Sequence, residues 1–210
     1  GSYSAPTMAT ILAQETRAGE ALETVVAEAR ACRVCEAHLP LGPRPVLRGR
    51  AGARLLVVGQ APGTRVHETG IPWNDASGKR LRAWLELDDE TFYDEDRIAI
   101  VPMGLCYPGT NGKGGDAPPR PECAPLWHER LRAALPAVGL TLLVGQYAQR
   151  WYLGARRRDS MTETVRAFRD YLPALLPLPH PSWRTTAWQK ANAWFDDEVL
   201  AEARRRVRAL

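Results

Sequence analysis

The sequence predicts a three-layer α/β/α sandwich, an α/β fold with a central, mostly parallel four-stranded sheet. Two observations lead to this fold class. Short apolar runs of strand length recur along the chain, as expected for strands that are buried on both faces. Turns and then segments with helical spacing follow these runs, and strands that alternate with helices indicate a parallel sheet covered by helices.

The expected elements follow in chain order. Strands are predicted at 55–58, 98–101 and 141–144, with a short, proline-interrupted fourth strand within 172–178. Helices are predicted at 9–31, 78–87, 122–135, 146–153 and 187–208. Parallel α/β folds bind ligands at the carboxyl ends of their strands, so the loops of interest are 59–77, 102–121, 145–146 and 179–186. We expect the long, glycine-rich stretch 107–121 to be mobile.

Length and composition indicate one globular domain. The chain has 210 residues, of which 45% are hydrophobic and 25% charged, and we expect a single domain over 9–210 after a tag or disordered N-terminus over 1–8. The composition excludes collagen-like, coiled-coil and disordered classes. No apolar run reaches the length of a membrane span, and no secretory signal is evident, so we expect no membrane partner and a cytoplasmic location.

The basic residues are concentrated near the carboxyl end. Lys and Arg exceed Asp and Glu by four, and residues 151–210 carry this whole excess, with 11 basic and 7 acidic side chains. Such a distribution is compatible with a polyanionic partner such as nucleic acid. A solvated, arginine-rich helix face is the alternative interpretation.

Four cysteines form two half-sites. Cys32 and Cys35 make a C-x2-C pair, and sixteen residues separate Cys106 from Cys123. Thiolates at such spacings suit zinc or an iron–sulfur cluster. If folding joins the half-sites, they link the N-terminal helix to the middle of the chain. Four free thiols are the alternative.

Three motifs lie at predicted strand ends. In Gly59-Gln60-Ala61-Pro62-Gly63, glycines allow a close backbone approach, and backbone N–H groups can hold a phosphate or a base carbonyl, although a simple tight turn would look the same.

The second motif, 70–78, places an aromatic, an amide and a carboxylate side by side. Trp73 can stack on a planar base, Asn74 can read a donor–acceptor edge, and Asp75 can orient or activate a water. The alternative is that Asp75 or Ser77 only caps the following helix.

The third motif follows the predicted fourth strand. His180 is well placed to touch a ligand, while Trp183 and Arg184 suit a wedge and a phosphate contact on nucleic acid. A structural histidine and a core tryptophan are the alternatives.

The motifs follow one another along the chain in the order C-x2-C, G-Q-A-P-G, T-G-I-P-W, C-x16-C and H-P-S. In this order the sequence resembles the uracil-DNA glycosylase superfamily, most closely its iron–sulfur branch, which is the fourth, thermophile-type family. The resemblance runs from about Ala31 to the last helix. It implies the α/β/α fold and a monofunctional enzyme that flips uracil out of single- or double-stranded DNA and hydrolyses its N-glycosidic bond, leaving an abasic site. We expect a monomer.

The resemblance also implies roles for individual residues. Trp73 falls on a phenylalanine that stacks on the flipped uracil, and His180 on a histidine that hydrogen-bonds a uracil carbonyl oxygen and stabilises the departing anion. Gln60 and Ala61 fall in the uracil-binding motif, Gln60 as a catalytic position through its backbone amides. The DNA-contacting positions are Pro62, Gly63, Pro181, Ser182, Trp183 and Arg184. Cys32, Cys35, Cys106 and Cys123 match the ligands of a structural [4Fe–4S] cluster, with zinc as the alternative, and no catalytic metal is expected.

Three departures from the family pattern affect the chemistry. Gln60 replaces a glutamate, and Ala61 stands where the best-known uracil glycosylases have a water-activating aspartate. Pro102 replaces a uracil-reading asparagine, and Asn74-Asp75 replace apolar or small residues. We hypothesise that Asn74 reads the uracil edge instead and that Asp75 supplies the missing carboxylate near the sugar.

Some assignments stay open at this point. His67 and Glu68 are second candidates for positioning water, and 63–67 is the local candidate stretch for excluding the thymine methyl. Because the uracil-reading asparagine is displaced, a glycosylase for hypoxanthine or xanthine is one alternative. Because the usual carboxylate is missing, a non-catalytic binder of uracil-containing or abasic DNA is another. A nucleotide or ester hydrolase is weaker, since G-x-S-x-G and Walker motifs are absent.

Overall fold

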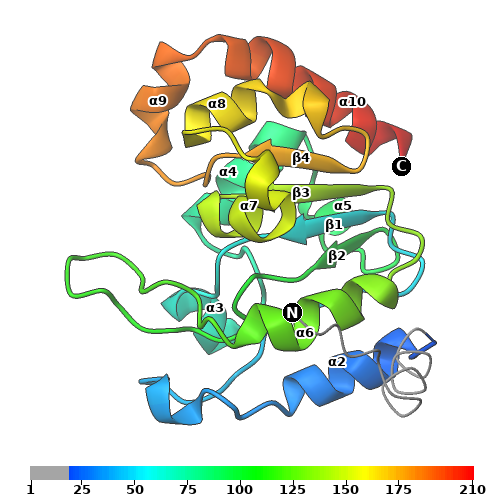
Figure 1. Ribbon diagram of the computed structural model, residues 1–210, viewed down its shortest axis with the longest axis vertical. Helices are drawn as coiled ribbons and strands as arrows, with labels where there is room; N and C mark the ends of the chain where they lie inside the picture. Colours follow the sequence, from blue (N-terminus) through cyan, green and yellow to red (C-terminus); the bar gives the residue numbers. More distant parts are fainter. Residues whose placement is uncertain (1–18) are drawn as a thin grey trace, which may run out of the picture.

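A computed structural model, which describes residues 19–210, folds around a four-stranded parallel sheet (Figure 1). Its strands are β1 (Leu55–Val58), β2 (Ile98–Ile100), β3 (Leu140–Val144) and β4 (Leu175–Leu178), in the spatial order β2-β1-β3-β4. All three strand pairs are parallel, so the predicted fold class is confirmed. The expected tag over 1–8 and the first part of the expected helix 9–31 lie outside the described residues.

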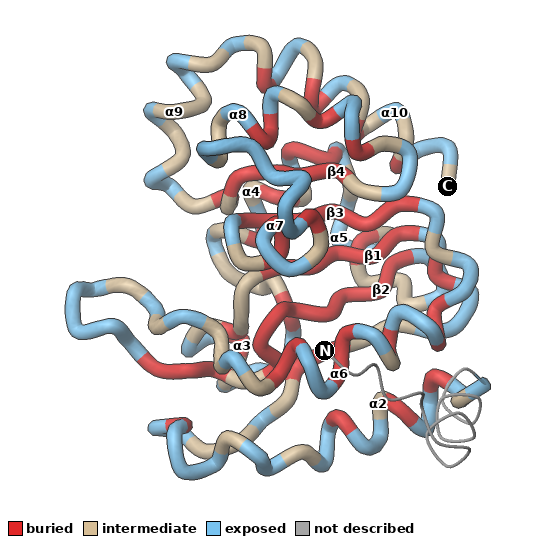
Figure 2. Tube along the Cα trace, viewed as in Figure 1, coloured by how far each residue is buried: buried red, intermediate tan, exposed pale blue. Residues whose placement is uncertain are grey.

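Side chains that alternate along the strands bury both faces of the sheet. Leu56 and Val58 pack in one core with helices α2 (Leu22–Arg30), α6 (Cys123–Ala133) and α7 (Gln146–Leu153). Leu55 and Val57 pack in the other core with α4 (Ala76–Leu85), α5 (Asp89–Phe92), α8 (Met161–Arg166) and α10 (Ala201–Ala209). The result is three layers, with the buried strands running through the middle of Figure 2.

The expected helix 187–208 is interrupted. It consists of α9 (Thr185–Ala191), a π-helical turn (Phe195–Leu200) and α10. Asn192 causes the break, because its side chain donates to the Trp188 carbonyl at 2.8 Å and its Oδ1 accepts from the Trp194 indole at 3.1 Å. Such local hydrogen bonds compete with the helical backbone pattern. Trp188 and Trp194 still pack against the core, as the sequence predicted for this face.

The structure contains short helices that periodicity did not reveal. They are α3 (Thr64–Thr69), inside the expected loop 59–77, together with α5, α8 and the 3₁₀ turns Glu36–His38, Gly154–Arg156 and Phe168–Asp170. One to two turns are too short for a periodic signal. In addition, α4 begins two residues before the expected start, because Asp75 caps it.

The strand-end loops meet at one edge of the sheet, on the left in Figure 1, where α3 and the long loop after β2 also lie. The long loop is partly paired: Thr110 and Asp116 form an antiparallel bridge, and Asn111 Oδ1 accepts the N–H groups of Lys113 and Gly115. Its expected mobility stays a prediction. Among residues 19–210, no helix has both the length and the apolar character needed to cross a bilayer.

Candidate active site

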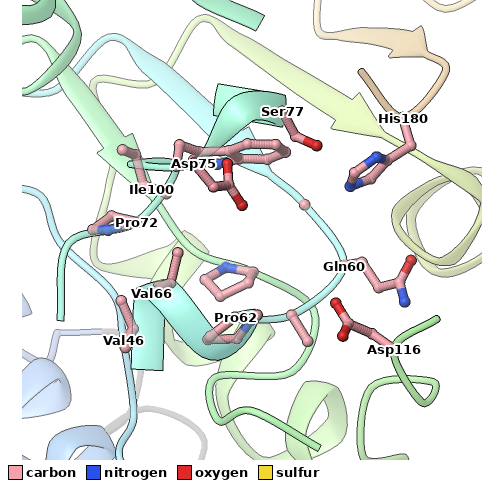
Figure 3. Close-up of a pocket in the computed structure, with 15 residues that line it drawn as sticks. Val46, Gln60, Pro62, Val66, Pro72, Asp75, Ser77, Ile100, Asp116 and His180 are labelled. Atoms are coloured by element: carbon pink, nitrogen blue, oxygen red, sulfur yellow. The ribbon is translucent and has the colours of Figure 1, made fainter. Parts of the chain in front are cut away.

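A cavity of about 120 Å³ opens at the carboxyl edge of the sheet. In Figure 3, apolar side chains such as Val46 and Ile100 lie on one side of it, and Gln60, Asp116 and His180 lie on the other. The full lining is Val46, Gly59, Gln60, Ala61, Pro62, Gly63, Val66, Pro72, Trp73, Asp75, Ser77, Ile100, Pro102, Asp116 and His180. The structure therefore brings most of the first and second motifs together with the histidine of the third.

The Gly59–Gly63 turn is fixed to the segment that follows β2. The Met103 N–H donates to the Gly59 carbonyl at 2.8 Å, and the Gly104 N–H donates to the Gln60 carbonyl at 2.9 Å. Four residues of this turn, Gln60, Ala61, Pro62 and Gly63, line the cavity as the motif predicted. Because both carbonyls point away into these bonds, the turn presents a rigid backbone surface.

Trp73 lines the cavity and has a strained backbone conformation. Its φ is +60°, a left-handed value that non-glycine residues seldom adopt. Two glycines make room for it, since a Cβ on Gly59 would meet the indole at 2.6 Å and one on Gly78 would meet the Trp73 carbonyl at 1.6 Å. Arg82 holds the segment by donating to the Trp73 carbonyl at 2.8 Å. Strain of this kind is concentrated at functional sites.

Asp75 both caps a helix and lines the cavity. Its Oδ1 caps α4 by accepting the Gly78 N–H at 2.8 Å. The same carboxylate also lines the cavity and points into it (Figure 3). The cap fixes the carboxylate from behind, and one oxygen atom is left to face a ligand.

His180 lies beside Trp73 in the cavity wall, with their ring centroids 6.0 Å apart and their planes tilted by 34°. The loop is fixed because the His180 carbonyl accepts from the Ser182 N–H at 2.9 Å and from the Thr185 hydroxyl at 2.5 Å. Burial lowers the pKa of His180, and the negative charge of Asp75 acts in the opposite direction. A neutral imidazole is therefore favoured, which can donate one N–H to a ligand.

Asn74 is not part of the cavity wall, which corrects the predicted position of this side chain. Its amide nitrogen donates to the Thr69 hydroxyl at 2.9 Å, and its backbone carbonyl accepts from Arg65 at 2.7 Å. The left-handed turn at Trp73 directs adjacent side chains differently from an extended segment, so Trp73 and Asp75 face the cavity while Asn74 faces α3.

The second candidates for positioning water also lie elsewhere. His67 and Glu68 are on α3 and do not line the cavity. The His67 ring lies 6.1 Å from that of Tyr107. Of the stretch 63–67, the cavity is lined by Gly63 and Val66.

Asp116 is a cavity residue that the sequence analysis missed. It comes from the long loop after β2, and its carboxylate lies on the polar side of the cavity (Figure 3). Partial burial raises its pKa, and the negative charge of Asp75 adds to this effect. The only sequence signal was an aspartate in a long strand-end loop, since no motif connects it with the residues that it joins.

The segment after His180 differs sharply in exposure. Pro181 is buried and Ser182 half-buried, whereas Trp183 is 77% exposed. The Arg184 guanidinium lies 5.5 Å from the centre of the Trp183 ring. A large exposed aromatic with an adjacent cation, close to the cavity, has the form expected of a wedge on nucleic acid.

The four cysteines line a second cavity. Cys32 and Cys35 follow α2, Cys106 follows β2, and Cys123 begins α6. The Leu105 N–H donates to the Cys123 sulfur at 3.2 Å. Apolar side chains form most of the remaining wall, among them Leu39, Leu105 and Trp127. Folding therefore joins the two half-sites, as their spacing predicted.

The fold and the first cavity define an α/β/α protein that binds a planar ligand at the carboxyl edge of its sheet. A parallel α/β/α sandwich binds its ligand at the carboxyl edge, and here the cavity offers an aromatic face, a histidine and carboxylates, with no Lys or Arg among its described lining residues. Such a site suits an uncharged planar group better than a phosphate.

The family model of the uracil DNA glycosylase superfamily matches residues 48–204, and the chain belongs to this superfamily. It is a DNA glycosylase, a hydrolase of base excision repair that binds DNA and cleaves the N-glycosyl bonds of damaged bases.

Proposed function

We propose that the damaged base is uracil and that the enzyme is a monofunctional uracil-DNA glycosylase. The observation that carries this proposal is the convergence of Trp73, Asp75 and His180 with the Gly59–Gly63 turn in one cavity. Of the described residues that line the cavity, none is a lysine. Water, rather than an amine of the protein, is therefore the nucleophile that this site supports.

The cavity supports recognition of a flipped pyrimidine. Extrusion of the base costs a few kcal/mol, which contacts with DNA phosphates and the stacking surface of Trp73 offset. The His180 N–H donates to a uracil carbonyl oxygen, and the rigid backbone of Gln60 and Ala61 lies beside it. Val66, which is buried at the apolar side, is the member of 63–67 that we propose contacts C5 and excludes the thymine methyl.

The electrostatics of the site suit cleavage of the bond between C1′ and N1. As this bond breaks, positive charge develops on the sugar and negative charge on the base. Asp75 stabilises the sugar cation, and the His180 N–H stabilises the departing uracil anion. Both charges are larger in the transition state than in the bound substrate, so these contacts lower the barrier rather than only strengthening binding.

The donor set of the cysteine cavity, four thiols among mainly apolar side chains, suits a [4Fe–4S] cluster, with zinc as the alternative. The thiolates of a four-iron cluster bind four different irons, so they surround a common cavity without converging on one ion. Cys32, Cys35, Cys106 and Cys123 would hold it, and the Leu105 N–H would donate to a cluster thiolate. The cluster supplies a structural cross-link between three segments.

The function is tested by incubating the protein with labelled single- and double-stranded oligonucleotides that carry one uracil, and then treating the products with alkali. Cleavage at the uracil is expected, and loss of cleavage in His180→Ala purified identically excludes a contaminating enzyme. If uracil remains while the protein still shifts uracil-containing or abasic DNA, the chain is a non-catalytic binder. If a hypoxanthine-containing strand alone is cleaved, the base assignment is wrong.

A further inference from the structure

Asp116 reaches the cavity from a segment that the glycosylase motifs do not include. It lies between Cys106 and Cys123, in the loop after β2, and its carboxylate lines the cavity beside the Gly59–Gly63 turn. Its Oδ2 lies 3.6 Å from the position that a Cβ on Gly63 would occupy. That separation is an ordinary van der Waals contact, so the Asp116 carboxylate lies close to Gly63 of the motif.

The backbone around Asp116 is held on both sides. Asp116 pairs with Thr110 across the loop, and the Ala117 N–H donates to the Gly109 carbonyl at 2.8 Å. The Asn111 N–H donates to the Gly115 carbonyl at 2.9 Å. These bonds deliver the carboxylate from a paired hairpin rather than from an unconstrained loop.

No hydrogen-bond donor or cation of the described chain pairs with the Asp116 carboxylate, and the other carboxylate of the cavity is Asp75. Partial burial and the charge of Asp75 both raise the pKa of Asp116. Two carboxylates that share a cavity without a counter-ion are unfavourable in the free protein. The arrangement becomes favourable when positive charge appears between them, as it does on the sugar in the reaction.

We propose that Asp116 binds and deprotonates the attacking water, while Asp75 acts as the fixed charge beside the sugar. This inference rests on the proposed glycosylase chemistry. The water oxygen forms a bond to C1′ as the bond between C1′ and N1 breaks, and the electron pair of that bond leaves on N1 of the base. The water proton passes to the Asp116 carboxylate.

The two carboxylates differ in ways that support this division. Asp75 Oδ1 accepts a hydrogen bond from the Gly78 N–H, which fixes the carboxylate and partly neutralises its negative charge. Asp116 lines the cavity with a carboxylate that has no partner among the described residues, and the residue is exposed, so water has access to it. Ala61 in the Gly59–Gly63 turn lines the cavity without a group that can accept a proton, so a carboxylate that does so comes from a different segment.

Single-turnover excision by the complete protein, with enzyme in excess over DNA, tests the assignment. Asp116→Asn is expected to slow excision about 100-fold, the lower range for a general base, while DNA binding stays equal or becomes tighter because a negative charge is removed. Asp159→Asn is the matched control, since it makes the same change at an exposed aspartate outside the cavity, and it should match wild type.

A pH profile separates proton transfer from a structural role. The titratable groups that face Asp116 are Asp75, Tyr107 and His180. The wild-type excision rate should rise with pH as Asp116 ionises. Asp116→Asn should lose that rise, while any dependence of the rate on the protonation of His180 should remain. An unchanged rate in Asp116→Asn, or a slowed rate with the rise retained, overturns the inference.

The same variants are also assayed on a hypoxanthine strand, so that an error in the base assignment is distinguishable from an error in the role of Asp116. Excision of hypoxanthine but not uracil would refute the uracil assignment, yet a loss in Asp116→Asn on that strand would still support the water role. A wild-type protein that excises neither base would overturn both.

Discussion

The two cavities of this molecule are built in opposite ways. The base cavity is polar on one side and takes its key residues from the segments that follow β1, β2 and β4. The cysteine cavity is mainly apolar apart from its thiols, and it is assembled where the end of α2, the segment after β2 and the start of α6 meet. The first is suited to developing charge, and the second to cross-linking. The residues of the first that belong to sequence motifs follow strand ends, whereas Asp116 in the first and all four cysteines of the second depend on contacts between distant segments.

The two cavities share structural elements. The segment from Cys106 to Cys123 has its ends at the cysteine cavity and Asp116 at the base cavity. Further along α6, His128 Nε2 bonds to the Pro102 carbonyl at 2.8 Å, and Pro102 lines the base cavity. The cysteine cavity is therefore placed to fix part of the wall of the base cavity without contacting the base.

Asp75→Asn has the largest expected effect, which is on the excision rate and not on the stability of the fold. Asparagine is also a good N-cap, so α4 should keep its first turn and the melting temperature should change little. Loss of the charge beside the sugar should slow uracil excision about 1,000-fold, within the range for a positioned carboxylate. Rapid-quench excision and thermal unfolding measure the two properties. A large fall in stability with a nearly normal rate would show that Asp75 is only a cap.

Cys123→Ser tests the cysteine cavity. The absorbance of the proposed cluster should disappear, and the free energy of unfolding should fall by about 4 kcal/mol, as for loss of a ligand present at 1,000 times its Kd. Excision should fall less than in Asp75→Asn, because no catalytic group is removed. Leu126→Ala is a control that opens the same wall without removing a thiol. Retained absorbance and four irons per chain in Cys123→Ser would exclude Cys123 as a ligand.

Predictability from sequence follows the same division. The strands were found because four apolar runs are buried on both faces, and burial of that kind leaves a local signal. The break at Asn192 was missed, since it depends on side-chain hydrogen bonds that periodicity does not report.

The site was predictable where a motif follows a strand directly. Gln60 and His180 were located from the sequence in this way, and both line the cavity. Asn74 was misplaced because the left-handed turn at Trp73 reverses the direction of its neighbours. Asp116 was missed because only tertiary folding brings its loop over Gly63.

His128, on α6, connects the two cavities through its bond to the Pro102 carbonyl. It is 1% exposed, and burial lowers its pKa to about 4 from the ordinary 6.5. Between those values the unfolded chain binds more protons than the folded one, so stability rises with pH across this window. The His128 contribution should decrease by about 2 kcal/mol from pH 7.5 to pH 5.

Urea unfolding of wild type and His128→Gln at several pH values measures that contribution as a difference. The glutamine amide can still donate to the Pro102 carbonyl but does not titrate. The stability of wild type relative to His128→Gln should therefore decline as the pH falls from 7.5 to 5. A constant difference would show that His128 does not titrate in this window, and that its role is packing alone.

Trp183→Ala has the smallest expected effect and distinguishes the surface next to the base cavity from the cavity itself. Because Trp183 is 77% exposed, its removal should leave stability unchanged. If its ring fills the space left by the flipped base, excision from double-stranded DNA should slow about 10-fold, since stacking of a base is worth about 1–3 kcal/mol. Single-stranded DNA has no partner strand to hold open, so excision of uracil from it should change less.

Trp151→Ala removes another exposed indole, on α7, and should affect the two substrates alike. Equal losses on both substrates in Trp183→Ala would mean that Trp183 binds the strand without acting as a wedge.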